Sequence, residues 1–168
     1  MPVTPFHFIV AAPIKALAPK KFSWAVFCLT NILIDLEPVV CFLITLEPRH
    51  MFFHTFVGAS LVATISAIYG RRICMIAIDI WNQEMSGAVE SRWLITNRII
   101  NKTSAWVGAL TGAWSHLLLD SFMHNDIKPL SPFTDTNLLL GLINVGWLHV
   151  ICVGLGLIGF LLLIIKRI

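Results

Sequence analysis

Four long apolar runs dominate the sequence and constrain its fold more than any other feature. They extend over about residues 22–46, 51–70, 105–123 and 144–165. Each is close to the roughly 20 residues that a helix needs to cross the hydrocarbon core of a bilayer. Because 57% of the residues are hydrophobic and only 12% are charged, the composition excludes a disordered chain, a coiled coil and most soluble enzymes. The sequence therefore predicts an all-α integral membrane bundle with four spanning helices, in a single domain over 1–168.

Two further segments differ from these runs. The apolar stretch 6–18 is too short to span a bilayer, and Thr4-Pro5 at its start favours a half-helix or re-entrant element. Residues 71–104 carry many charges, with Trp81 and Trp93 among apolar residues. This pattern is typical of one or two amphipathic helices lying in the membrane interface, and a solvated loop without a role is the alternative.

Lysine and arginine are divided unevenly between the two ends of the predicted spans. Ten of the 12 lie on one side, and only Arg49 and Lys128 lie on the other. Because cytoplasmic loops of membrane proteins carry an excess of these residues, the pattern predicts a cytoplasmic (inner) membrane protein with both ends toward the cytoplasm. The loops 47–50 and 124–143 then face outward. The net charge of +3 forms no basic face, so we expect no nucleic-acid partner.

Ionisable side chains inside apolar segments are costly and therefore mark candidate functional residues. Those in or beside the predicted spans are His7, Asp35, Glu37, His54, His116, Asp120 and His149. Counting about 1.5 Å per helical residue from the nearest cytoplasmic charge places them about 20–27 Å deep. All seven therefore fall in the outer third of a core roughly 30 Å thick.

The third apolar run presents its polar residues on one face. Gly108, Gly112, His116, Asp120 and His124 recur every four residues, which places them on one stripe of a helix. The two glycines allow a neighbouring helix to approach closely below the polar patch.

Histidine and carboxylate side chains from several helices are the ligands of a zinc-type metal site. The predicted ligands are His7, Asp35, His54, His116, Asp120 and His124. We expect one or two divalent ions, zinc in the first place and manganese as the alternative. Such an ion would offset the cost of the buried carboxylates and lower the pKa of a bound water toward neutrality. A single intramembrane histidine is also often a hydrogen-bond partner between helices. The metal site is therefore predicted from the seven residues of the layer together and not from any one histidine.

Two carboxylates are candidates for a catalytic role. Asp35 and Glu37 lie two residues apart, and either can act as a ligand or as a general base. In a regular helix they point about 200° apart, and a proline such as Pro38 can kink the helix at this point. The sequence leaves open whether His50 and His149 belong to the site, and it favours loop-capping roles for Asp126 and Asp135.

Four motifs together resemble a known family. They are TPFH at 4–7, IDLEP at 34–38, HTFVGA at 54–59 and SHLLLD at 115–120. In this order they resemble the YdjM/YbcI-type family of predicted membrane-bound, metal-dependent hydrolases. The family pattern has a second aspartate where this chain has Glu37, and an arginine after the first histidine of its next motif, which is missing after His50.

A weaker resemblance concerns the order of the ligands. His7, Asp35, His54 and the HxxxD motif at 116–120 follow the ligand order of zinc-dependent phospholipases C and single-strand zinc nucleases, which are all-α enzymes. A later HxxxE motif of those enzymes is not reproduced, since His149 is followed four positions on by Val153. The resemblance therefore implies one or two metal ions rather than three.

The leading functional hypothesis is a hydrolase that opens toward the outer membrane face. Its expected substrate is an amphiphilic phosphate ester, such as a membrane lipid or a lipid-linked phosphate, and Arg49 and Lys128 are candidates for orienting the phosphate. A transporter of divalent metal ions or protons is the first alternative, although the inner halves of three spans carry no ionisable residue. A metal-stabilised scaffold without turnover is the second alternative.

Overall fold

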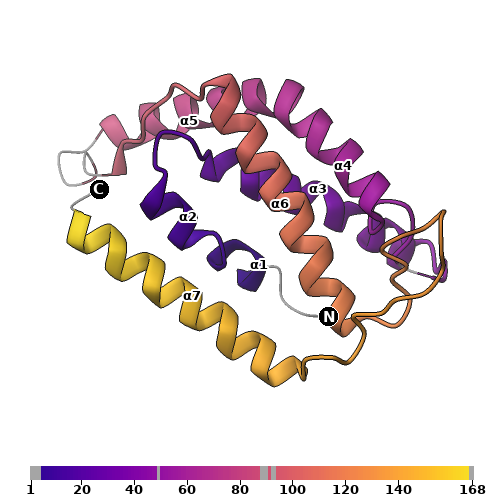
Figure 1. Ribbon diagram of the computed structural model, residues 1–168. Helices are drawn as coiled ribbons and strands as arrows, with labels where there is room; N and C mark the ends of the chain where they lie inside the picture. Colours follow the sequence, from indigo (N-terminus) through magenta and orange to yellow (C-terminus); the bar gives the residue numbers. More distant parts are fainter. Residues whose placement is uncertain (1–4, 49, 88–90, 92–93, 167–168) are drawn as a thin grey trace.

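The computed structural model describes residues 5–48, 50–87, 91 and 94–166. This described part contains helices and connecting segments but no strand, which confirms the predicted all-α class. The elements in chain order (Figure 1) are α1 (Pro5–Ile9), α2 (Ala12–Leu17), α3 (Trp24–Leu43), α4 (Phe56–Ile65), the π-helical turn η1 (Ser66–Gly70), α5 (Arg71–Ser86), α6 (Lys102–Met123) and α7 (Val145–Lys166).

Three helices are long and apolar enough to cross a membrane. They are α3, the continuous 31-residue helix formed by α4, η1 and α5, and α7. The fourth predicted span corresponds to α6, which has the required length but lies outside this group. The buried residues of α6 are mostly small or polar, and they include Gly108, Gly112, His116 and Asp120. The structure thus confirms three of the four predicted spans by length and composition.

The second apolar run begins and ends differently from the prediction. We expect a helix over 51–70, but α4 begins at Phe56, and the residues before it form a non-helical segment. At the other end the helix does not stop, because η1 continues into α5 as far as Ser86. The predicted half-helix over 6–18 is divided into the short helices α1 and α2.

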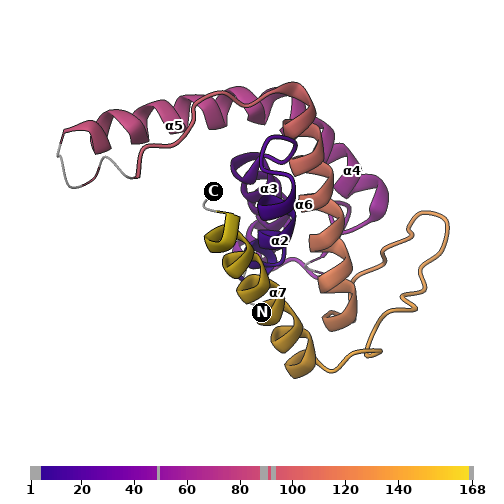
Figure 2. The ribbon, with the colours of Figure 1, turned by 60° about the vertical axis from the view of Figure 1, so that its left-hand side comes forward.

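In the described part of the segment 71–104, α5 is one helix, one of the two predicted possibilities, and residues 95–101 return as a non-helical chain. Arg98 pairs with Asp79 at 2.9 Å, and Asn82 exchanges two hydrogen bonds of 2.8 Å with the backbone of Thr96. These contacts hold the returning chain alongside α5, which projects away from the other helices in Figure 2. Trp93 lies outside the described residues.

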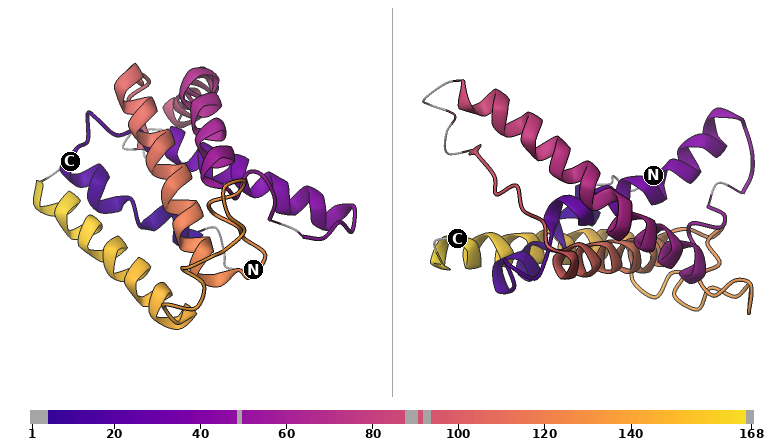
Figure 3. Two further views of the ribbon diagram at one scale, coloured as in Figure 1. Left: turned by 45° about the vertical axis from the view of Figure 1, so that its right-hand side comes forward. Right: turned by 90° about the horizontal axis from the view of Figure 1, so that it is seen from above.

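The ends of the bundle differ in charge. At one end, Lys166 Nζ donates to the Ala16 carbonyl at 3.3 Å, and Arg71 Nε donates to the Ile100 carbonyl at 2.7 Å. The end of α2, the beginning of α6 and the end of α7 therefore gather beside the basic residues. Figure 3 shows α7 running alongside α2 in the same region. The opposite end carries the loops 44–55 and 124–144.

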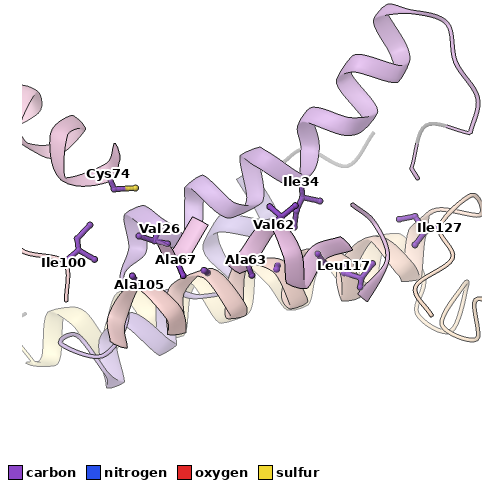
Figure 4. Packing of buried hydrophobic residues seen from close by; sticks show 13 residues of the cluster. Val26, Ile34, Val62, Ala63, Ala67, Cys74, Ile100, Ala105, Leu117 and Ile127 are labelled. Carbon is purple, nitrogen blue, oxygen red and sulfur yellow. The ribbon is translucent and has the colours of Figure 1, made fainter. Parts of the chain in front are cut away.

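Close packing of α3 against α6 forms the centre of the molecule. A Cβ atom on Gly112 would lie 2.9 Å from the Phe27 carbonyl oxygen, and one on Gly108 would lie still closer to the Ser23 carbonyl. The glycine spacing thus permits the close approach that the sequence predicts. Small buried side chains fill the adjoining core in Figure 4, and they include Val26, Val62, Ala63, Ala67 and Ala105.

Replacing Gly108 with alanine is expected to destabilise the protein. The added methyl group meets backbone of α3 rather than a movable side chain, so the two helices must separate. Overpacking of this kind costs about 1–3 kcal/mol, which corresponds to several degrees in the apparent Tm. Gly154→Ala is the matched control, because nothing lies within 4 Å of its added Cβ atom. Equal Tm values for the two variants in detergent would contradict this prediction.

Candidate metal centre

Four of the predicted ligands meet in one buried cluster. Each of Asp35, His54, His116 and Asp120 offers one ligand atom, and these atoms all lie within 4.8 Å of one another. Asp120 Oδ2 lies 3.1 Å from His116 Nε2 and 3.6 Å from His54 Nε2. Asp35 Oδ1 lies 3.3 Å from His116 Nε2. We refer to these four residues as the primary cluster.

Three separate parts of the chain supply the primary cluster. His116 and Asp120 stand one turn apart on α6 and therefore share a face. Asp35 comes from α3, which packs closely against that face. His54 directly precedes Thr55, whose side chain caps α4 by accepting a hydrogen bond of 3.0 Å from Gly58 N. The cap sets the start of α4 directly after His54, which leaves the histidine just outside the helix.

Asn31 fixes the orientation of the His116 ring. Its Nδ2 atom donates to the Phe27 carbonyl at 2.9 Å, which leaves Oδ1 facing His116 Nδ1 at 3.0 Å. With the proton on Nδ1 donated to Asn31, the lone pair of Nε2 points into the primary cluster. Both residues are fully buried.

Glu37 plays the same part for the His54 ring. Its Oε2 atom lies 3.1 Å from His54 Nδ1. The carboxylate also accepts backbone hydrogen bonds of 2.9 Å from Met51 and Phe53. Glu37 therefore lies behind His54, and the structure does not bring it among the four residues of the primary cluster. A carboxylate behind a histidine is the usual outer partner of a metal-binding imidazole.

The buried atoms of the cluster fit a metal ion. Among the described residues, His54 Nε2, His116 Nε2 and Asp120 Oδ1 are buried and form no hydrogen bond of good geometry, although His116 Nε2 lies 3.1 Å from Asp120 Oδ2 and Asp120 Oδ1 lies 3.2 Å from His7 Nε2. Leaving such groups unsatisfied costs about 1–3 kcal/mol each, and native proteins avoid it. Imidazole nitrogens and carboxylate oxygens are ligands of zinc and related divalent ions. The primary cluster thus has the chemistry and the burial of a metal site.

His7 joins this arrangement from α1. Its Nε2 atom lies 3.2 Å from Asp120 Oδ1, and its side chain is 3% exposed. The ring stacks on that of His116 with the centroids 4.3 Å apart. The structure therefore places this predicted ligand beside the primary cluster, in contact with Asp120.

A second group of potential ligands adjoins the first. His50, Asp120 and His124 each offer a ligand atom within 4.8 Å of the others, and we call them the secondary cluster. His50 Nδ1 lies 2.9 Å from both carboxylate oxygens of Asp126. The sequence leaves open whether His50 belongs to the site, and the structure places it in the secondary cluster. It places His149 elsewhere, with its ring 4.4 Å from that of Phe6.

Two groups in the loop that follows α6 have shifted pKa values. Burial raises the pKa of Asp126, but hydrogen bonds from the side chain and backbone of His50 outweigh it and lower the pKa below its usual value. Burial lowers the pKa of His124, and the nearby Asp120 carboxylate opposes this shift. The neutral form of His124, which is the metal-binding form, is therefore favoured.

The basic candidates of the outer loops do not extend the site. Lys128 Nζ pairs with Asp135 at 2.8 Å, and both side chains are more than half exposed, which is typical of surface charge. Arg49 lies outside the described residues.

Sequence reasoning missed two residues that orient the histidines. Asn31 stands one helical turn before Asp35 inside an apolar run. This spacing indicates that the two side chains share a helix face and could have marked Asn31 as part of the site. Asp126, predicted to cap a loop, holds His50 instead, across 76 residues of sequence, and no local pattern indicates this contact.

Comparisons of the chain with protein-family models, with curated proteins and with solved structures found no match. The functional argument therefore depends on the geometry of the two clusters.

Proposed function

We propose that the protein is a membrane-embedded, metal-dependent hydrolase that cleaves a phosphate ester of an amphiphilic lipid. The observation that carries this proposal is the convergence of two buried histidine Nε2 atoms, neither in a hydrogen bond of good geometry, on two carboxylates. The resemblance to the YdjM/YbcI-type hydrolases points to the same class of activity. The excess of lysine and arginine at one end of the bundle supports a site near the outer face of the cytoplasmic membrane.

The primary cluster would hold a divalent ion, with zinc preferred over manganese because two of the four ligands are imidazoles. Such an ion supplies Lewis acidity and lowers the pKa of water to about 7. Asn31 and Glu37 keep a proton on Nδ1 of His116 and His54, so that both Nε2 atoms face the ion.

Asp35 is the accessible member of the primary cluster. Its side chain is 27% exposed, whereas that of Asp120 is 4% exposed and those of the two histidines are fully buried. Substrate and water therefore approach from the side of Asp35. We assign to its carboxylate the acceptance of the proton that the attacking water loses.

An apolar groove next to the primary cluster supports a lipid substrate. The groove has a volume of about 440 Å³, within the range of about 300–1,000 Å³ for small-molecule sites. Leu117 and Ser121 line it and directly follow His116 and Asp120, while Phe56 lies two residues after His54. The remaining wall comes from α6 and the outer loop, and it includes Trp114, Leu118, Leu130 and Leu138.

We assign this groove to one hydrocarbon chain of the lipid substrate. Leu117 and Ser121 in its wall directly follow His116 and Asp120 on α6, and other apolar side chains of the wall are well exposed, such as Leu118 at 49% and Leu138 at 73%. A chain lying there keeps its head group beside the primary cluster, which positions the ester bond.

Leu118→Asn is expected to discriminate between long-chain and soluble substrates. The polar side chain weakens contact with the hydrocarbon chain, so kcat/KM for a long-chain phosphatidylglycerol should fall about tenfold, or about 1.4 kcal/mol. The fall for soluble para-nitrophenyl phosphate should be smaller. Leu157→Asn on α7 is the control, because Leu157 is equally apolar and 59% exposed but lies outside the groove. A similar loss for both substrates would rule out a lipid chain in the groove.

The function itself is tested on protein purified in detergent. We expect zinc-dependent or manganese-dependent hydrolysis of para-nitrophenyl phosphate or of phosphatidylglycerol in mixed micelles. Activity should disappear on chelation and in the His116→Ala/Asp120→Ala double variant. Metal bound without hydrolysis would favour the scaffold alternative, and zinc flux into proteoliposomes would favour a transporter. The absence of bound metal after reconstitution would contradict the proposal.

A further inference from the structure

The secondary cluster lies directly beside the primary one. The His50 ring stands between those of His54 and His124, with centroid distances of 4.7 Å and 4.4 Å. A neutral imidazole binds a metal ion through the lone pair of one ring nitrogen. Three histidines that gather at this spacing thus present nitrogen ligands to a shared region.

His50 is held in the orientation that a metal ligand needs. Both Asp126 oxygens lie 2.9 Å from its Nδ1, and Asp126 Oδ2 also accepts a hydrogen bond of 3.2 Å from the His50 backbone N–H. The proton is therefore kept on Nδ1, and Nε2 is the nitrogen left to bind an ion. This is the same arrangement that Glu37 gives to His54 in the primary cluster.

Asp120 belongs to both clusters. Its Oδ2 atom lies between His116 and His54, whereas its buried Oδ1 atom lies 3.2 Å from His7 Nε2. A carboxylate has two oxygens with separate lone pairs, so one residue can serve two neighbouring ions. Shared carboxylates of this kind fit sites in which two ions act together on one phosphate group.

We propose that His50, His124 and Asp120 bind a second divalent metal ion, with Asp120 shared between the two ions and Asp126 positioning His50. This inference rests on the proposed metal centre and extends it from one ion to two. The second ion lies on the outer side of the first, since His50 and His124 belong to the loops that end α3 and α6. A phosphate ester approaching from outside then meets both ions.

Metal stoichiometry tests this inference directly. Elemental analysis of zinc-saturated protein in detergent should give about two equivalents for the wild type and about one for His50→Ala and for His124→Ala. His149→Ala is the matched control, because this histidine lies outside both clusters, and it should keep about two. Asp126→Asn leaves every ligand in place and should weaken only the second ion, by about 10–100-fold in Kd.

Manganese distinguishes shared from separate ions. Two manganese ions joined by Asp120 should give an exchange-coupled paramagnetic resonance signal, which His50→Ala converts into that of an isolated ion. A wild type that binds about one ion, unaffected by His50→Ala, would overturn the second site and leave the hydrolase proposal standing. A wild type that binds no ion would overturn both. Two uncoupled ions would overturn the sharing of Asp120.

Discussion

The Asp120→Asn variant is expected to lose bound zinc and about 10³-fold or more in kcat/KM. Asp120 contributes to both clusters, and its Oδ2 atom lies 3.1 Å from His116 Nε2. Asparagine keeps the shape of the side chain but removes the negative charge and one of the two oxygens. No other residue of the site serves both clusters, so this substitution should have the largest effect on metal binding.

Thermal stability separates this loss from misfolding. A ligand that binds only the folded state stabilises it by about 4 kcal/mol at a concentration 1,000 times its Kd. Zinc should therefore raise the apparent Tm of the wild type and leave that of Asp120→Asn unchanged. In the presence of a chelator the variant should be less stable than the wild type, because His7, His54 and His116 lose the buried carboxylate that they contact.

The control for Asp120→Asn is Asp79→Asn on α5. Asp79 is an exposed carboxylate paired with Arg98, far along the chain from both clusters. This variant should keep the zinc-dependent rise in Tm and the activity of the wild type. If Asp120→Asn retained its zinc-dependent rise in Tm, the carboxylate would not be a ligand, and the proposed centre would be wrong.

The convergence of the polar residues follows from the physics of a membrane helix. A charged or polar group in an apolar run is costly unless it meets a partner, so residues such as Asp35, His54 and His116 are expected to meet one another. Counting helical rise from the basic end places them in one layer, and the structure brings them within hydrogen-bonding reach. The glycine stripe likewise predicts the close approach of α3 and α6.

The start of α4 could not be predicted in the same way. Residues 51–55 are as apolar as a spanning helix, and their local sequence favours one. Glu37, 14 and 16 residues earlier in the chain, accepts the backbone N–H groups of Met51 and Phe53 and thereby holds this segment open. A contact between distant residues overrides local propensity here, and periodicity carries no information about it.

The positions of Asp35 and Glu37 show how a regular helix can serve one site with two faces. Helix α3 continues through Pro38 to Leu43, so the two side chains remain about 200° apart. Asp35 therefore contacts His116 on α6, while Glu37 reaches the segment before α4. The sequence predicts both residues at the site but cannot assign them to different neighbours.

Glu37→Gln is expected to weaken zinc binding by about 10–100-fold while leaving kcat at saturating zinc within a few-fold of the wild type. The glutamine has a single acceptor oxygen, whereas Glu37 accepts from His54 and from two backbone N–H groups. It must therefore give up at least one of these contacts. The His54 ring then loses its fixed orientation, and excess zinc should restore the activity because the ligand itself remains. Zinc titration of activity and of apparent Tm measures both quantities.

A general base would respond differently to the same substitution. If Glu37 took the proton from water, kcat would fall by about 10²–10⁴-fold at every zinc concentration, and zinc affinity would stay near that of the wild type. Glu84→Gln, an exposed position on α5, provides the control for the change of charge. The geometry favours the positioning role, because Glu37 lies on the side of His54 opposite the primary cluster, with its two oxygens accepting three hydrogen bonds. A carboxylate so placed has no path to a water molecule at the centre unless the His54 ring moves away first.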